Sequence, residues 1–136
     1  KFGYSVLYPR AWLARALDDT ETEVMISPPQ GGEFFEVLVE ENPDRLSAAE
    51  WFLEKFPGTG SSDLMPFTTS SGLSGVKSAD RLNAYLAADD KVYILMYNIG
   101  TLTEAQYLTT FDLLLQSFSR FVPPEAATIE TSTSTL

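Results

Sequence analysis

The chain has 136 residues, which is long enough for one domain with an ordinary hydrophobic core. Nine basic and nineteen acidic residues give a formal net charge of −10, which opposes binding to nucleic acid or to an anionic membrane and favours a basic protein partner or a cation. There is no cysteine and no histidine, so disulfides, thiolate nucleophiles, Ser-His-Asp triads and histidine-ligated zinc sites are excluded.

Four short segments near the start of the chain have the patterns of strands. Residues 3–9 form an apolar and aromatic run that ends at a proline, and residues 24–27 form another that ends at two prolines. Residues 13–17 fit a strand or a helical turn, and we favour the strand. Residues 34–40 alternate between apolar and polar side chains, which predicts a half-buried antiparallel strand.

The first helix is predicted by signals at both of its ends. Ser47 and Glu50 have the spacing of a capping box, in which each side chain accepts a hydrogen bond from the other residue's backbone amide. Leu46 and Trp51 occupy the two positions of a hydrophobic staple around this box. A Pro-Gly pair follows Phe56 and ends the helix there.

The next segments predict strands and a hairpin. Residues 64–69 fit a weak strand, and residues 76–88 fit one long strand, with an interruption near Asp80 and Arg81 as the alternative. A tight turn at the following Asp-Asp pair leads into residues 92–97, an apolar run typical of a strand covered on both faces. Pairing across this turn joins Ala88 to Lys91, Leu86 to Tyr93 and Ala84 to Leu95.

The last ordered element is predicted to be a second helix. The run from Thr103 to Gln106 matches a second capping box, with Leu102 and Tyr107 at its staple positions. The helix should bury one apolar face against the sheet, formed by Tyr107, Phe111, Leu114 and Phe118. Residues 123–136 lack apolar periodicity and predict a disordered tail or linker after a single domain at residues 1–122. These elements predict an α+β fold, an α/β/α sandwich with a central, mainly antiparallel sheet and two main helices.

The sequence offers little for catalysis or metal binding. Asp18, Asp19, Glu21 and Glu23 cluster in one acidic turn that could hold Ca²⁺, but the turn has no glycine to fold the carboxylates inward, so we expect no metal site. Glu36 and Glu40 share a strand face, but about 13 Å separates them, too far for a glycosidase pair. We therefore expect no catalytic residues and no cofactor.

Four aromatic residues fit the predicted core less well than the others. These are Tyr8, Trp12, Phe34 and Phe67, and we predict that some of them contact a protein partner.

The order of several motifs resembles the PsbP-like family. The resemblance rests on three parts of the sequence. They are the start from Phe2 to Tyr8-Pro9 and Trp12, the helix at residues 47–56, and the ending at residues 91–121 with its Ser117-Phe118 pair. This family includes the extrinsic P subunit of photosystem II and bacterial secreted lipoproteins. The resemblance implies an antiparallel sheet between helices, no enzymatic activity and an extracytoplasmic setting, which is periplasmic, cell-surface or thylakoid-lumenal. It assigns no functional residue, and it implies contact with a membrane only through an N-terminal anchor outside this sequence.

We therefore expect a non-catalytic, extracytoplasmic binding or assembly module with a protein partner and no nucleic acid. The alternative is a carrier of a small apolar ligand or lipid, held in a pocket between the sheet and a helix. A pocket of a few hundred Å³ favours the carrier, whereas a flat apolar or charged patch favours the partner module.

Overall fold

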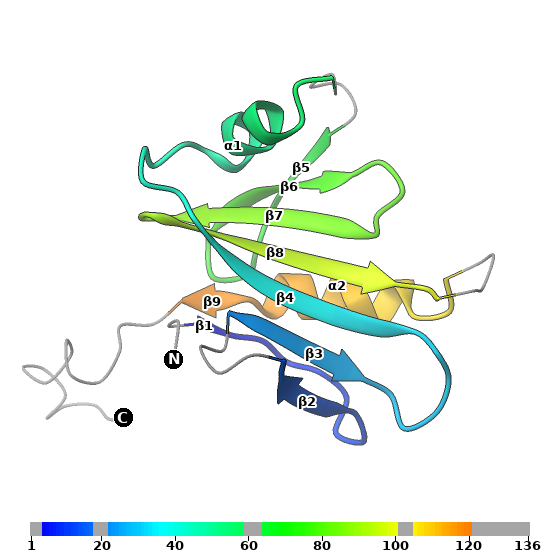
Figure 1. Cartoon of the computed structure of the whole chain (residues 1–136). Coiled ribbons are helices and arrows are strands. Elements are labelled where there is room, and N and C mark those ends of the chain that lie inside the picture. The colour runs from blue at the N-terminus through cyan, green and yellow to red at the C-terminus, as the bar shows by residue number, and fades with distance from the viewer. Residues whose placement is uncertain (1–3, 18–21, 59–63, 101–104, 121–136) are drawn as a thin grey trace, which may run out of the picture.

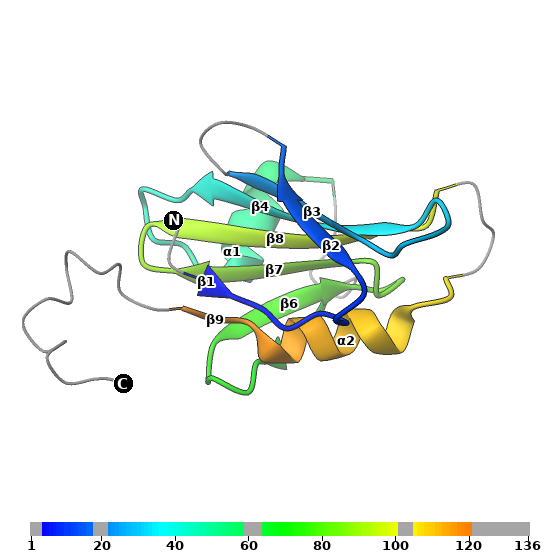
Figure 2. The same ribbon diagram turned by 90° about the horizontal axis from the view of Figure 1, so that it is seen from below.

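The computed structural model describes residues 4–17, 22–58, 64–100 and 105–120, and its centre is a seven-stranded antiparallel sheet. Along the sheet the strands run in the order β2-β3-β4-β8-β7-β6-β5. In chain order they are β2 (Leu13–Ala16), β3 (Glu23–Ser27), β4 (Phe34–Glu41), β5 (Leu64–Thr68), β6 (Ser74–Ser78), β7 (Asn83–Ala88) and β8 (Lys91–Asn98). Helix α1 (Ala48–Lys55) lies on one face of the sheet and helix α2 (Leu108–Ser117) on the other (Figures 1 and 2). The predicted α+β sandwich is confirmed.

The N-terminal strand is shorter than its sequence pattern predicts. It consists of β1 (Tyr4–Ser5), which pairs with β9 (Ser119–Arg120) in a small separate sheet on the side of α2 (Figure 2). Beyond β1 the backbone turns to the end of α2, where the amide of Leu7 donates to the hydroxyl of Ser117 at 2.8 Å. Residues 6–9 of the predicted strand therefore lie outside both sheets, and Gly3 is not among the described residues.

The segment 76–88 forms two strands rather than one. A turn after β6 contains Arg81, whose φ of +67° lies in the left-handed region, and β7 returns antiparallel to β6. The alternative with an interruption near Asp80 is thus confirmed. The β7–β8 hairpin has the predicted register, in which Ala88 faces Lys91. The other two predicted pairs, Leu86 with Tyr93 and Ala84 with Leu95, are also present.

The main core lies between the sheet and α2. From the helix, Phe111, Leu114 and Phe118 are fully buried, as their helical spacing predicts. They pack against side chains that share one face of the central strands: Phe35, Val37, Leu86, Tyr93, Leu95 and Tyr97. A second, smaller core lies under α1, where Trp51 and Phe52 contact Val76, Tyr85 and Val92 on the opposite face.

The predicted capping box of α1 is present. The amide of Glu50 donates to the Ser47 hydroxyl at 3.2 Å, and the amide of Ser47 donates to the Glu50 carboxylate at 3.0 Å. Both bonds satisfy amides that the first turn of a helix leaves without intrahelical partners. They also explain the lowered pKa of the Glu50 carboxyl, because the backbone amide of Ser47 stabilises its charged form.

The predicted start of α2 is wrong. The helix begins at Leu108, and its N-cap Tyr107 makes no side-chain capping bond. The first two residues of the predicted box, 103 and 104, lie outside the described residues. The amide of Gln106 instead donates to the Tyr97 hydroxyl at 3.0 Å and to the Glu33 carboxylate at 3.1 Å. These bonds to the sheet hold Gln106 outside the helix.

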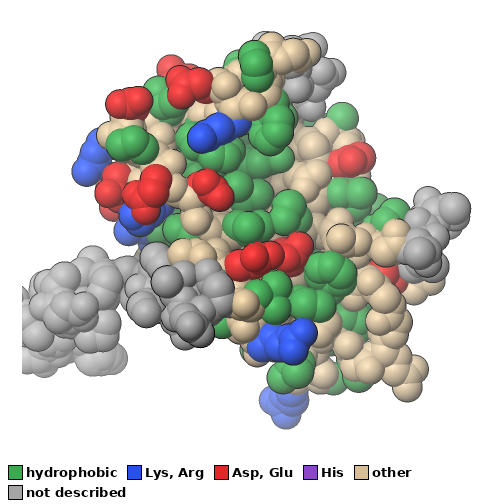
Figure 3. Space-filling view, viewed as in Figure 1, with side chains coloured by type: hydrophobic (Ala, Val, Ile, Leu, Met, Phe, Trp, Pro, Cys, Tyr) green, Lys and Arg blue, Asp and Glu red, His purple; other side chains and the backbone are tan. Residues whose placement is uncertain are grey.

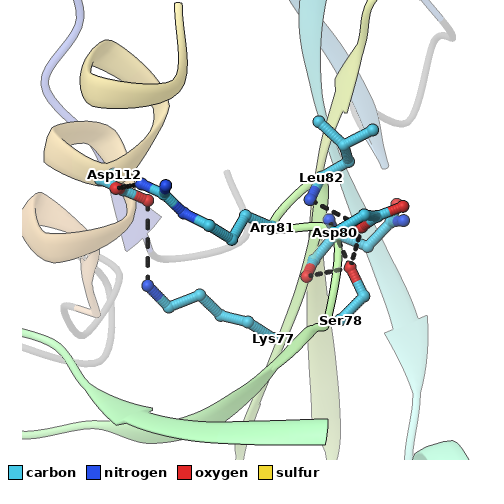
Figure 4. Close-up of polar contacts among 7 residues, drawn as sticks. Lys77, Ser78, Asp80, Arg81, Leu82 and Asp112 are labelled. Carbon is cyan, nitrogen blue, oxygen red and sulfur yellow. Dashed lines mark hydrogen bonds and ion pairs between the residues drawn. The ribbon is translucent and has the colours of Figure 1, made fainter. Parts of the chain in front are cut away.

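Ion pairs fasten α2 to the β6–β7 hairpin. Asp112 of α2 contacts Arg81 from the turn, and its other carboxylate oxygen lies 3.8 Å from Nζ of Lys77 on β6 (Figure 4). The turn itself is stabilised by a hydrogen bond from the Ser78 hydroxyl to the Asp80 carboxylate, at 2.6 Å. The hairpin therefore contacts α2 through charges as well as through the core.

The predicted tail at residues 123–136 lies outside the described residues, so the structure does not test it. Within the described ranges, neither helix has the length and hydrophobicity that a membrane span requires.

Candidate interaction surface

One half of the face that carries α1 is left without a helix. The helix packs over β6 and β7, whereas no helix covers β2, β3, β4 and the adjoining part of β8 within the described residues (Figure 1). The strand register identifies the side chains on this uncovered area, which we call the open face. They are Leu13, Arg15, Glu23, Met25, Phe34, Glu36, Leu38 and Met96.

The open face is largely apolar although it borders solvent. Phe34, Met25, Leu38 and Met96 are half-buried, and Leu13 at the sheet edge is 65% exposed. Figure 3 shows hydrophobic side chains gathered across the middle of this side of the molecule, with acidic side chains among them. Methionine side chains adapt their shape to a binding surface, so this composition suits contact with another molecule.

Two glutamates lie side by side within this apolar area. Met25 pairs with Glu36 and Glu23 pairs with Leu38 across β3 and β4, so the two glutamates are diagonal neighbours on one face. Their carboxyl groups are joined by a side-chain hydrogen bond, which one of them can donate only when protonated. Burial, the hydrogen bond and the negative charge of Glu23 together raise the pKa of Glu36 to about 7. Near neutral pH the Glu36 carboxyl is therefore partly protonated.

The four aromatic residues predicted to contact a partner do not form one site. Trp12 belongs to the main core, where its ring centroid lies 5.0 Å from that of Phe35 and 4.9 Å from that of Tyr107. Phe67 packs against the same core, with Nζ of Lys77 5.2 Å from its ring centroid. Both rings are thus held by contacts inside the domain.

The other two aromatic residues lie on different surfaces. Phe34 is on the open face, opposite Asn98 of β8. Tyr8, 41% exposed, lines a surface hollow of about 380 Å³ beside α2, together with Leu7 and Leu113. Of the predicted set, only Phe34 belongs to the surface that carries the glutamate pair.

A hollow also lies between the sheet and α1, the kind of position predicted for a ligand carrier. It has a volume of about 270 Å³ and is lined by Ser47, Ala48, Ser74, Gly75, Val76 and Ala87. Two of these lining residues are serines, and the hollow does not include the glutamate pair.

Among the described residues, no group of three or more acidic side chains is placed to hold a metal ion. The predicted acidic turn lies mostly outside them, because residues 18–21 are not described. Its last member, Glu23, is on the open face instead, beside Glu36. Sequence spacing pairs Glu36 with Glu40 of its own strand and gives no sign of its cross-strand neighbour.

Comparison with known proteins bears on the fold. No protein-family model matches the chain. No curated protein matches it either. Among solved structures, the chain is similar to cyanobacterial PsbP (CyanoP) from Synechocystis sp. PCC 6803, with a TM-score of 0.52 at 15% sequence identity. The match covers 88% of this chain and 87% of that one, so it extends over nearly the whole fold.

Proposed function

The chain has a PsbP-like fold, and from this premise we propose that it is a non-catalytic binding or assembly module whose protein partner docks on the open face. The observation that carries the proposal is the apolar area of β2, β3, β4 and β8 beside α1. A sheet face normally buries its apolar side chains under another layer. A docked partner supplies that layer here.

The family resemblance supports the same proposal in a second way. It implies an extrinsic subunit that works by attaching to a larger assembly, in an extracytoplasmic setting. The net charge of −10 agrees with a protein partner and opposes nucleic acid. We propose both the setting and the partner for this chain on that basis.

A non-catalytic role fits the placement of the acidic residues. The pair Glu23 and Glu36 lies on a sheet face and lines none of the hollows described above. Catalytic carboxylates work in sites that surround a substrate and exclude water. The second candidate function, a carrier of a small apolar ligand, is favoured by the hollow under α1.

Site-specific cross-linking in cells of the native source tests the docking surface. A photoreactive amino acid at Leu38, in the middle of the open face, should capture one protein reproducibly. The same group at Glu54, exposed on α1, serves as the matched control and should not capture it.

The captured protein is then purified and its affinity for the chain measured. Leu38→Glu should weaken binding at least tenfold, because it places a charge in an apolar interface. Thr109→Glu, an exposed position on the opposite side, should leave binding unchanged, and both variants should keep the thermal midpoint within a few degrees. Capture from Glu54 alone, or full affinity in Leu38→Glu, contradicts the proposal.

A further inference from the structure

We propose that the outer edge of β2 binds an extended segment of the partner, which adds to the sheet as a further strand. This inference rests on the proposed docking function and adds the way in which the partner's backbone is held. β2 is the last strand at one end of the seven-stranded sheet, and β5 is the last strand at the other end (Figure 1). Among the described residues, no further strand of this sheet lies outside either of them.

The register of β2 against β3 shows which of its backbone groups point outward. The amide of Leu17 donates to the carbonyl of Glu23 at 2.8 Å, so these two residues form a hydrogen-bonded pair just beyond β2. Bonded and non-bonded pairs alternate along an antiparallel ladder, so Arg15 also bonds to β3, whereas Ala14 and Ala16 do not. The N–H and C=O groups of Ala14 and Ala16 therefore point away from the sheet. Within the described ranges no hydrogen bond occupies them.

The opposite edge of the sheet is closed by a proline. The amide of Thr69 donates to the carbonyl of Leu73 at 2.8 Å, so the same alternation can be followed along β5. The residues whose backbone groups point outward there are Leu64, Pro66 and Thr68. Proline has no N–H group, so the middle of this edge cannot donate to an added strand, which is a common protection of edge strands. The edge of β2 contains no proline and keeps both of its donors.

The side chains of β2 determine which segment fits beside it. Leu13, Arg15 and Leu17 share the side of the open face, and both leucines are exposed. A segment that adds to β2 places alternate side chains next to these leucines, and apolar side chains are favoured there. Ala14 and Ala16 face the other way, where their small side chains leave room for β-branched residues opposite. The segment is thus an alternating, mainly apolar strand that borders the surface on which the partner docks.

A second copy of this chain fits the edge badly. Antiparallel pairing of two β2 strands through Ala14 and Ala16 sets the Arg15 side chains of the two copies directly opposite each other. Two chains that each have a net charge of −10 also repel one another. A charged side chain on an edge strand is a common protection against self-pairing. The segment that binds here therefore belongs to a different protein.

Peptide binding followed by NMR tests the edge directly. The probe is the capped peptide acetyl-Lys-Leu-Val-Thr-Val-Leu-Lys-amide, whose valines can pair with Ala14 and Ala16. The matched control peptide carries N-methyl groups on both valines, so it lacks two N–H donors but keeps the charge and the side chains. In the ¹⁵N-labelled chain, the probe should shift the amides of Ala14 and Ala16 saturably and leave the amide of Thr68 on the β5 edge unchanged. The N-methylated peptide should bind at least tenfold more weakly.

Two substitutions of the exposed Ala16 complete the test. Ala16→Pro removes the outward N–H without removing a bond to β3, so the dissociation constant of the probe should rise at least tenfold. Ala16→Val adds a side chain of similar size and keeps the N–H, so the affinity should stay unchanged. Both variants should keep the thermal midpoint within a few degrees, because prolines are tolerated at outward positions of edge strands.

Three results overturn the edge inference: no saturable shift at Ala14 and Ala16, equal shifts at Thr68, or equal binding of the N-methylated peptide. Full affinity in Ala16→Pro also overturns it. Shifts at Ala14 and Ala16 that grow with the concentration of the chain alone identify a second copy as the occupant and contradict a different protein. Leu38→Glu, two strands away on the open face, should leave probe binding unchanged. The cross-linking experiment decides the docking function independently, so the two failures are distinguishable.

Discussion

Tyr97 joins the sheet to the start of α2 through a buried polar contact. Its hydroxyl donates a hydrogen bond to the carboxylate of Glu33. The same hydroxyl accepts hydrogen bonds from the amides of Gln106, at 3.0 Å, and Tyr107, at 2.8 Å. The side chains of Tyr97 and Glu33 are almost fully buried. Burial, followed by the hydrogen bond to Glu33, raises the pKa of Tyr97 to about 12, so the hydroxyl remains protonated at any physiological pH.

Tyr97→Phe should therefore lower the free energy of unfolding by about 1–3 kcal/mol, because the buried Glu33 carboxylate loses one donor and the amide of Tyr107 loses its acceptor. Chemical denaturation at pH 7 measures this change. Tyr85→Phe is the matched control, since Tyr85 is also buried in the sheet but its hydroxyl makes no hydrogen bond with the described residues. It should change stability by less than about 0.5 kcal/mol. Equal effects of the two substitutions would show that the contact is not what stabilises the start of α2.

Single residues also mark the limit of sequence reasoning about the site. The pairing of Leu86 with Tyr93 was predictable because a two-residue turn sets the register of the hairpin. The pairing of Met25 with Glu36 was not predictable, because the sequence of the loop between β3 and β4 does not by itself determine the register of the two strands. Glu23 therefore looked like the end of an acidic turn, and its contact with Glu36 had no local signal.

At the scale of elements, α1 depends on its N-cap. It is only eight residues long, and an isolated helix of that length is not stable in water. Its stability comes from the capping box and from Trp51 and Phe52, which pack on the sheet.

Ser47→Ala should lower the free energy of unfolding by about 1 kcal/mol, because the amide of Glu50 loses its acceptor. Thermal or denaturant unfolding monitored by circular dichroism measures the loss. Ser70→Ala is the control, because Ser70 is exposed and, within the described part of the chain, it bonds only through its backbone amide, which donates to the carbonyl of Gln116. A loss below about 0.3 kcal/mol for Ser47→Ala would mean that packing alone holds the helix.

The two helices show why one capping pattern was informative and the other was not. At α1 the capping box is formed by two exposed residues, Ser47 and Glu50, and within the described ranges no tertiary contact competes for their amides. Near α2 the amide of Gln106 is taken by Tyr97 and Glu33, which lie 9 and 73 residues away in the sequence. Such distant partners leave no local pattern, so the helix was predicted to begin too early.

At the scale of the whole molecule, the two faces of the sheet are closed to different extents. One face is covered by α2 and the β1–β9 pair, whereas the other is covered by α1 over β6 and β7. The type of most elements was predictable because helical and strand periodicities are strong in this sequence. The two-residue strand β9 was not, because it is too short to show a periodicity. The lateral position of α1 was not predictable, and it is this position that leaves β2, β3 and β4 open for a partner.

The described domain ends where β9 pairs with β1. Arg120 of β9 forms an ion pair with Asp89 in the β7–β8 turn and lies over the ring of Tyr93, 6.0 Å from its centroid. These contacts tie the end of the domain to the central sheet. The residues from 123 onward are rich in Thr, Ser and Pro, and they lack an apolar period that could form a further element.

Removal of residues 123–136 should therefore leave the midpoint of denaturant unfolding unchanged, because this segment lacks the apolar periodicity that packing on the core requires. A shorter chain that ends at Phe118 provides the contrast. It loses β9, its pairing with Tyr4–Ser5 and the ion pair of Arg120, so its midpoint should fall clearly. If the first truncation lowers the midpoint as much as the second, the apolar residues of the tail, Ile129 and Leu136, contribute to the fold and the domain extends beyond residue 122.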